Sequence, residues 1–281
     1  MKYKKILMVI GVVVIVALGG VGVMAWQRGV FAPADADNPA KFIQHDFVDL
    51  AKIGSISKFR SNEGHDFSNG GETCRSMKHY FTPAFTDKDM QSLSNQPQDQ
   101  GKQLPPAPTA DTAVAIYAPV DGKITDIRSE HFPVGEQIFI TPDKAKGYSI
   151  RLFHIYPVDG IKSGSHVTAG QHIGDISRLS STDIAVQAGQ VNGRFVSYFD
   201  VMPDSIFASY QALGIKDRSD LIISKEYRDA HPFTCNGEEF SSKPQNSESA
   251  VIINGWSDPR MQPQQGPNQE TNEMPNSSQQ Q

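Results

Sequence analysis

The stretch "IRLFHIYPVDGIKSGSHVTAGQHIGDIS", residues 150–177, decides the fold. His154 lies inside its apolar run, and a loop with the spacing Gly-x-x-Val-x-x-Gly-x-x-Ile-Gly follows. The alternation of the run predicts a half-buried strand, with Tyr148, Ile150, Leu152 and His154 on one face. This pattern leaves two interpretations of His154: a hydrogen-bonded histidine of a β core or cleft edge, or a catalytic group.

Sequences on both sides of this stretch have the same strand signature. "AVAIYAPVDGKITDIR", from Ala113, alternates around a Pro-Val-Asp-Gly turn and predicts a hairpin. Several short strands at close spacing predict a mainly β fold, either a sandwich or a barrel. The further strands are expected at 136–142, 148–155, 172–176, 183–187 and 193–199.

After Pro203 the apolar residues recur at helical spacing, which predicts a few C-terminal helices over about 203–231. The first helix is expected to end at Gly214, a residue suited to a C-cap. The second is expected to begin at Ser219, a capping residue, and to stop before Pro232.

The N-terminus predicts a membrane anchor. Residues 1–5 contain three lysines and form a cytoplasmic tip, and residues 6–26 are uncharged. At about 1.5 Å per residue this segment reaches roughly 31 Å, enough to cross a bilayer core as one transmembrane helix. The lysines place the N-terminus in the cytoplasm and the rest of the chain outside. Cleavage of a signal peptide near Ala25, giving a secreted protein, is the alternative.

The remaining boundaries follow from composition. Residues 27–41 are small and polar and predict a linker, and residues 42–256 form the extracytoplasmic domain, with its β core at 113–200. Within it, residues 87–112 predict an exposed loop poor in regular structure. Residues 257–281 are rich in Gln, Asn and Pro and predict a disordered tail.

Charge and cysteine content narrow the class of protein. Lys and Arg number 26 and Asp and Glu 31, a net charge of −5, which does not indicate nucleic-acid binding. The two cysteines, Cys74 and Cys235, lie in the extracytoplasmic part. Outside the membrane such a pair predicts a disulfide, and two free thiols are the alternative.

The order of hairpin, histidine strand and glycine turn over residues 113–177 resembles the lysostaphin-type zinc peptidases, bacterial peptidoglycan endopeptidases with a duplicated hybrid motif. The resemblance implies a lysostaphin-like β-sandwich or hybrid barrel. It also implies a zinc held by a His-x-x-x-Asp motif and by the second histidine of a His-x-His motif, with two further histidines assisting at the scissile amide.

These functional positions match only in part. His154 matches the catalytic histidine, and Asp66 resembles the Asp of the first zinc motif, but Asn62 stands where that motif has its histidine. Ser181 and Asp183 replace the His-x-His pair. Asp66 and Asp183 could hold a hard cation with waters, whereas a three-ligand zinc would also need His65 or His79.

The string "ETCRSMKHYFTP", residues 72–83, adds a second candidate site. Its Arg75 and Lys78 could hold a carboxylate or a phosphate. The alternative is a loop held by the disulfide, with its charges in solvent.

We expect a peptidase-like domain without a cofactor, which binds cell-wall peptide or glycan, or an envelope protein, without cleaving it. Related degenerate domains of the family regulate cell-wall hydrolases, so the resemblance implies a regulatory role. The first alternative is an active zinc-dependent peptidoglycan endopeptidase with altered ligands. The second is a purely structural module that scaffolds a complex.

Overall fold

The computed structural model describes residues 32–95, 98–99, 102–103, 106–130, 135–190, 192–236, 239–240 and 249–257. The predicted cytoplasmic tip (1–5), the predicted transmembrane anchor (6–26) and, apart from Ser257, the predicted tail lie outside these ranges. In the ranges described, no helix has the length and apolar character needed to span a membrane.

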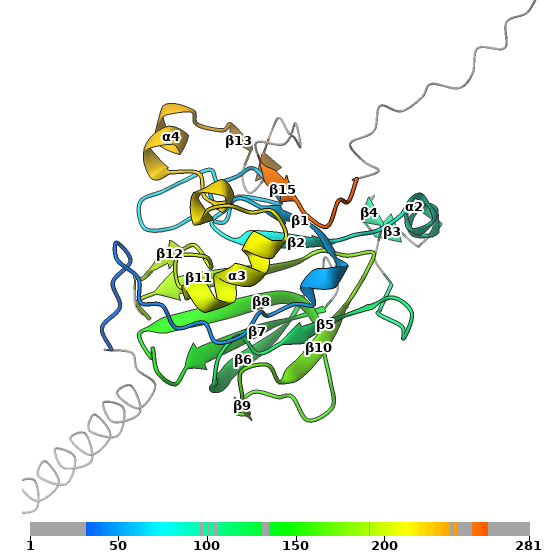
Figure 1. Cartoon of the computed structure of the whole chain (residues 1–281), viewed down its shortest axis with the longest axis horizontal. Helices are drawn as coiled ribbons and strands as arrows, with labels where there is room; N and C mark the ends of the chain where they lie inside the picture. Colours follow the sequence, from blue (N-terminus) through cyan, green and yellow to red (C-terminus); the bar gives the residue numbers. More distant parts are fainter. Residues whose placement is uncertain are drawn as a thin grey trace, which may run out of the picture.

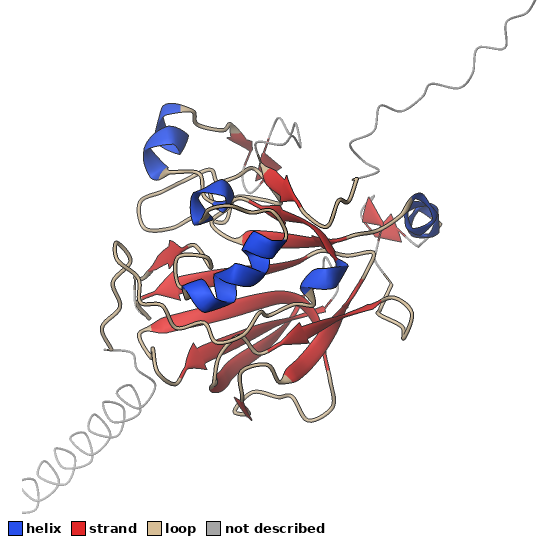
Figure 2. Ribbon diagram, viewed as in Figure 1, coloured by secondary structure: helices blue, strands red, loops and turns tan. Residues whose placement is uncertain are grey.

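The chain is mainly β, as the strand pattern predicted, with few helices (Figures 1 and 2). Its strands are β1 Ile53–Ser57, β2 His79–Pro83, β3 Gln98–Asp99, β4 Lys102–Gln103, β5 Ala113–Tyr117, β6 Gly122–Glu130, β7 Gly135–Pro142, β8 Tyr148–Pro157, β9 His166–Val167, β10 His172–Ser177, β11 Thr182–Ala188, β12 Arg194–Val196, β13 Cys235–Asn236, β14 Glu239–Phe240 and β15 Ala250–Ile252. Its helices are the 3-10 turns η1 Leu50–Lys52 and η2 Arg218–Leu221, and the α-helices α2 Asp87–Ser94, α3 Asp204–Ala212 and α4 Lys225–Ala230.

One antiparallel sheet organises the domain, with strand order β15-β1-β2-β11-β8-β7-β6-β9. Strand β8, which contains His154, is its central junction. Most of β8 pairs with β7 and β11, whereas its end, at Tyr156 and Pro157, pairs with β10, and β10 in turn pairs with β5. The histidine strand of the stretch 150–177 therefore lies at the centre of the sheet, whereas β9 of the same stretch lies at its edge.

The main core lies on the face of this sheet that α3 covers (Figure 2). Phe207 and Tyr210 of α3 pack their rings on Phe199, which follows β12. Apolar side chains of β5, β8, β10 and β11, among them Ile150 and Ile184, complete this core and are fully buried. A smaller cluster of Phe59, Met77, Phe153, Ala185 and Phe195 forms a second core.

Three local predictions are corrected by the structure. The Pro-Val-Asp-Gly turn does not close a hairpin, because β5 pairs with β10 while β6 pairs with β7 and β9. The predicted loop 87–112 contains α2 and the short β3–β4 pair. The second C-terminal helix is divided into η2 and α4: Ile222 is extended and bridges Phe59, and the α4 N-cap is Ser224 rather than Ser219.

Part of the predicted linker lies against the domain. Ala34 and Ala36 pack on the main core. The Ala40 N–H donates to the Tyr148 hydroxyl, which itself donates to the Asp35 carbonyl at 2.9 Å. The described residues of segment 27–41 are therefore held by the fold and do not act as a free tether.

A β-bulge sets the direction of His154. The β7–β8 register runs from Ile138 opposite Leu152 to Glu136 opposite Ile155, so β8 has one extra residue at this point. His154 has a left-handed backbone, with φ of 63°, as the extra residue of a bulge often does. The predicted shared face of His154 and Leu152 is therefore wrong: Leu152 and Ile155 enter the main core, and His154 turns to the face of Phe153.

Gly135, at the start of β7, makes room for this bulge. It has a φ of 142°, and a Cβ there would lie 2.7 Å from the carbonyl carbon of His154. We expect Gly135→Ala to lower the free energy of unfolding by more than about 1 kcal/mol, because both the backbone and the contact are unfavourable. Urea unfolding measures this. Gly160→Ala is the control, since its φ of 87° is also left-handed but its Cβ would meet nothing; equal losses would contradict the role assigned to the contact.

Candidate functional site

His154 belongs to a row of four charged side chains that come from different parts of the sheet. Its Nε2 lies 3.0 Å from Asp183 Oδ1 of β11, and its Nδ1 lies 2.9 Å from Glu130 Oε2 at the end of β6. The other oxygen of Asp183 lies 2.6 Å from Nζ of Lys78, which directly precedes β2. We call Lys78, Asp183, His154 and Glu130 the charge network.

The side chains of the charge network are buried. The side chains of Lys78 and Asp183 are 2% and 0% exposed, and those of His154 and Glu130 are 9% and 10% exposed. The Lys78 ammonium also lies 4.4 to 4.8 Å from the ring centres of Phe67, Tyr80 and Phe153, which enclose it. A buried ammonium is tolerated only with such compensation, from a carboxylate and from the faces of aromatic rings.

The bulge also gives Glu130 its position. The left-handed backbone of His154 directs its N–H to Glu130 Oε2 at 2.7 Å, the same oxygen that its Nδ1 approaches. Gln137 donates to the other oxygen of Glu130 at 3.0 Å. The backbone N–H and the side chain of His154 therefore both contact the carboxylate of Glu130.

Burial and neighbouring charges shift the pKa values of His154 and Asp183 in opposite directions. Burial alone would lower the pKa of His154, but Asp183 and Glu130 outweigh it and raise that pKa to about 9. Burial alone would raise the pKa of Asp183, but Lys78 and His154 outweigh it and lower that pKa to about 2. At neutral pH the site therefore contains an imidazolium and a carboxylate.

These pKa values predict how stability depends on pH. The raised pKa of His154, from 6.5 to about 9, gives stability that is complete below pH 6.5 and is lost as the pH rises through 9. The lowered pKa of Asp183, from 3.8 to about 2, gives stability that is complete above pH 3.8 and is lost as the pH falls through 2. We expect urea unfolding to show a loss on the order of 3 kcal/mol between pH 6.5 and 9. His154→Gln should flatten that slope, and an unchanged slope in this variant would contradict the assignment.

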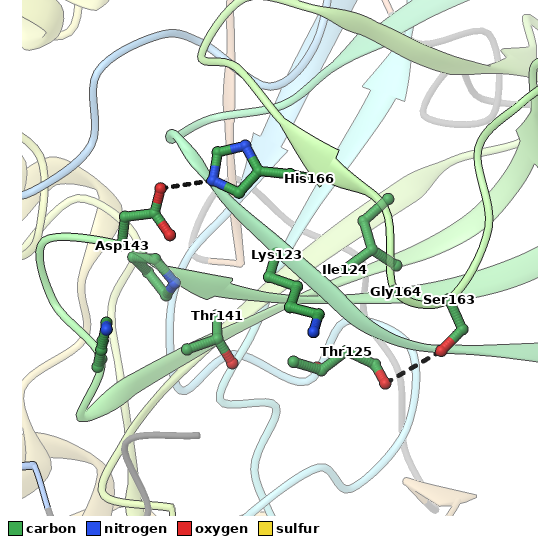
Figure 3. A pocket seen from close by; sticks show the side chains of 10 residues that line it. Lys123, Ile124, Thr125, Thr141, Asp143, Ser163, Gly164 and His166 are labelled. Carbon is green, nitrogen blue, oxygen red and sulfur yellow. Dashed lines mark hydrogen bonds and ion pairs between the residues drawn. The ribbon is translucent and has the colours of Figure 1, made fainter. Parts of the chain in front are cut away.

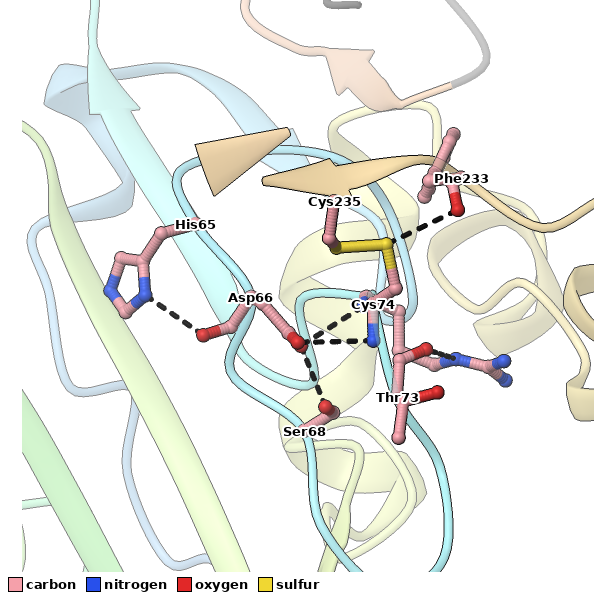
Figure 4. Close-up of a disulfide and its surroundings, with 8 residues drawn as sticks. His65, Asp66, Ser68, Thr73, Cys74, Phe233 and Cys235 are labelled. Carbon is pink, nitrogen blue, oxygen red and sulfur yellow. Dashed lines mark hydrogen bonds between the residues drawn. A yellow bond between two sulfur atoms is a disulfide. The ribbon is translucent and has the colours of Figure 1, made fainter. Parts of the chain in front are cut away.

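Asp66 has a structural position beside the disulfide (Figure 4). Its carboxylate accepts from the Ser68 hydroxyl at 2.6 Å and from the backbone N–H groups of Cys74 and Arg75, both at 3.1 Å. Cys74 needs this support, because its φ of 57° is left-handed. The predicted disulfide between Cys74 and Cys235 is confirmed.

Of the two predicted histidine ligands, His79 points away from the charge network. His79 is fully buried, with Nδ1 2.8 Å from the Ser57 carbonyl and Nε2 2.8 Å from the Ser197 hydroxyl, and burial lowers its pKa to about 4. Its neighbour Tyr80 is the residue whose ring contacts Lys78, so on this strand His79 points away from Asp183. His65 does approach the network, with Nε2 3.3 Å from Lys78 Nζ.

The two basic residues of segment 72–83 are paired within the chain. Arg75 contacts Glu72 and Asp229, both at 2.8 Å, and its side chain is 6% exposed. Lys78 contacts Asp183. The segment is held by the disulfide as the alternative predicted, but its two cations do not lie free in solvent, because each is paired with carboxylates of the chain.

The zinc that the resemblance implies does not fit these donors. Over the part of the chain that the structure describes, no three His, Cys, Asp or Glu side chains form a group that could hold a metal ion. Asp183 already contacts two cations, and a protonated His154 has no free nitrogen lone pair to donate to a metal. Asp66, His79 and Asp183 make separate contacts, so the structure does not bring the predicted metal set together.

Sequence reasoning missed Glu130 and the pairing of Lys78 with Asp183. The spacing of Lys78 and Tyr80, with aromatic residues nearby, is a weak signal of a buried cation. Glu130 gave no signal, because the two residues before it on β6 are exposed and its carboxylate reaches His154 only through the bulge.

A pocket of about 570 Å³ lies away from the charge network, between β6, β7 and the loop before β9. Figure 3 shows its lining, where His166 contacts Asp143 at 2.6 Å and the Ser163 hydroxyl donates to the Thr125 carbonyl. His166 and Asp143 are about half exposed, so this pair is a weak surface ion pair and does not resemble the charge network.

Comparison with known proteins finds similarity in solved structures alone. No protein-family model matches the chain, and no curated protein matches it in sequence. A chain of the SpoIIQ–SpoIIIAH pore-forming complex is 13% identical, with 61% of this chain and 98% of that chain covered and a TM-score of 0.38.

Two further structures have the same kind of similarity. Csd3 from Helicobacter pylori is 15% identical, with 79% of this chain and 49% of that chain covered and a TM-score of 0.37. The catalytic domain of lysostaphin from Staphylococcus simulans is 17% identical, with 37% and 92% covered and a TM-score of 0.25. The chain is thus distantly similar in fold to lysostaphin and related structures, and this similarity assigns no activity to it.

Proposed function

We propose that the chain is a membrane-anchored, extracytoplasmic, peptidase-like domain that binds cell-wall material, or regulates a cell-wall hydrolase, without cleaving peptidoglycan. The charge network is the single observation that supports this most. Asp183 stands at the sequence position where the resemblance implies a zinc-binding histidine. Its carboxylate contacts the ammonium of Lys78 and the imidazolium of His154 instead.

Two properties of the network favour binding over hydrolysis. The carboxylate that could act as a general base has its pKa lowered to about 2, so it is a weak base at neutral pH. His154 is protonated there and shielded from solvent, so it cannot accept a proton from a water molecule. Neither group is poised to activate a nucleophile.

The test uses the full-length chain in detergent and purified insoluble peptidoglycan, with and without added zinc. We expect saturable sedimentation with the peptidoglycan and no release of new amino groups. Cleavage that stops on addition of a chelator would contradict the proposal and favour the alternative, an active endopeptidase with altered ligands. Neither cleavage nor sedimentation, and no effect on a cell-wall hydrolase assayed beside it, would favour a purely structural module.

A further inference from the structure

A second pocket, of about 450 Å³, opens beside the charge network on the same face of the sheet. Arg151 lies in the next row of that face, since it precedes Phe153 by two residues on β8 and pairs with Ala185 of β11. The pocket is lined by Phe67, Ser68, Asn69, Arg151, Gln187 and Phe195, and by Asp66 at its edge.

The Arg151 guanidinium has no carboxylate partner among the described residues. Its Nη2 donates to the Gln187 amide oxygen at 3.0 Å, and its buried Nε has no hydrogen-bond partner within the described structure. The nearest acid of the pocket, Asp66, accepts from Ser68 and from two backbone N–H groups instead.

Two other partly or largely buried arginines of this chain are paired with a carboxylate. Arg60 and Arg75 both contact Glu72, at 2.6 and 2.8 Å. Arg151 instead has a cationic neighbour: burial first, and then Arg128, lower the pKa of Arg151. A half-buried cation without a carboxylate partner costs stability, so the position of Arg151 at an open pocket needs a reason other than folding.

The walls of the pocket define the chemistry of a ligand. The guanidinium carbon of Arg151 lies 5.2 Å from the ring centre of Phe139 and 5.7 Å from that of Phe195, so two aromatic rings flank the guanidinium. Phe67 stacks on Phe195 at 4.7 Å and extends this apolar wall. A guanidinium that lines a pocket without a carboxylate partner matches a carboxylate, and the rings beside it match a small apolar group attached to that carboxylate.

We propose that Arg151 anchors the terminal carboxylate of a short cell-wall peptide, whose last side chain packs on Phe195 and Phe67. This inference rests on the proposed function, because it names the part of the wall material that the domain recognises. Arg151 is a binding residue, and the buried charge network maintains the shape of the adjoining face.

Calorimetric titration of the full-length chain tests this. The probes are diacetyl-Lys-D-Ala-D-Ala and the same peptide with a C-terminal amide. We expect the free acid to bind and the amide to bind at least about tenfold more weakly, because a charge-assisted pair is lost. Arg151→Gln should weaken binding of the free acid by a similar factor, and Arg151→Lys should weaken it less.

Arg128→Gln is the matched control. Arg128 also lies over Phe139, at 4.6 Å, but it is 63% exposed and already paired with Asp126. The Arg128→Gln variant should bind the peptide as tightly as the wild-type chain does. The Arg151→Gln variant should have a urea midpoint equal to or higher than that of the wild-type chain. Equal binding of acid and amide, or equal losses in the two variants, would overturn the inference.

Sedimentation with whole peptidoglycan separates this inference from the proposed function. If the wild-type chain and Arg151→Gln sediment equally and the free acid does not bind, the inference is wrong and the proposed function stands. If the wild-type chain neither sediments nor binds the free acid and has no effect on the cell-wall hydrolase, both are wrong.

Discussion

Asp183→Asn is expected to lower the free energy of unfolding by about 3–5 kcal/mol, among the largest effects of any single substitution in this domain. The change keeps the shape of the side chain and removes its charge. Lys78, whose side chain is 2% exposed, then keeps a buried ammonium with aromatic faces and His65 as neighbours, and no other ion pair of Lys78 is formed within the described residues. Urea unfolding at pH 6, where the network is fully charged, measures the loss.

Two variants make this result specific to the buried network. Asp143→Asn removes the carboxylate of the exposed pair with His166 and should cost less than about 1 kcal/mol. Lys78→Met should cost less than Asp183→Asn, because Asp183 keeps His154 as a partner. Similar losses for Asp143→Asn and Asp183→Asn would show that burial of the network has no energetic consequence.

Loss of the disulfide is the other large expected effect. Cys74 and Cys235 are 161 residues apart in sequence, so their bond closes a loop that contains most of the sheet. Cys235→Ser should cost on the order of 2–5 kcal/mol, because the unfolded chain regains the freedom that the loop removed. The urea midpoint of the wild-type chain, measured with and without a reductant, gives the same quantity independently.

The reductant is also the control for this effect. It should lower the wild-type midpoint close to that of Cys235→Ser and leave the variant unchanged. A wild-type midpoint that does not respond to complete reduction, verified by thiol titration, would contradict a stabilising role of the bond.

The sequence predicted the elements of the fold better than their connections. Alternation along β7, β8, β10 and β11 depends on local side-chain pattern, and these strands are where it placed them. The partner of β5 depends on packing between distant segments. The Pro-Val-Asp-Gly turn fits a hairpin locally, but Phe47 and Tyr117 are joined by a backbone hydrogen bond and β5 lies against β10. Local pattern does not contain this information.

The sequence identified some residues of the candidate site but not how they are arranged. His154 and Asp183 stood out because the resemblance gave them matching positions, and the structure places them 3.0 Å apart. Their relation depends on the extra residue of the bulge, and the bulge depends on Gly135 of another strand. Lys78 stood out as a possible ligand-binding cation, whereas its burial between three aromatic rings could be found only from the packed sheet.

The metal content of the full-length chain tests the central claim most directly. The chain is saturated with zinc at pH 7, passed through a desalting column and analysed for bound metal beside Asp183→Asn. The charge network predicts a substoichiometric zinc content that is the same in both proteins, because Lys78 and a protonated His154 already compensate the carboxylate. One zinc per chain, lost in Asp183→Asn, would contradict the account.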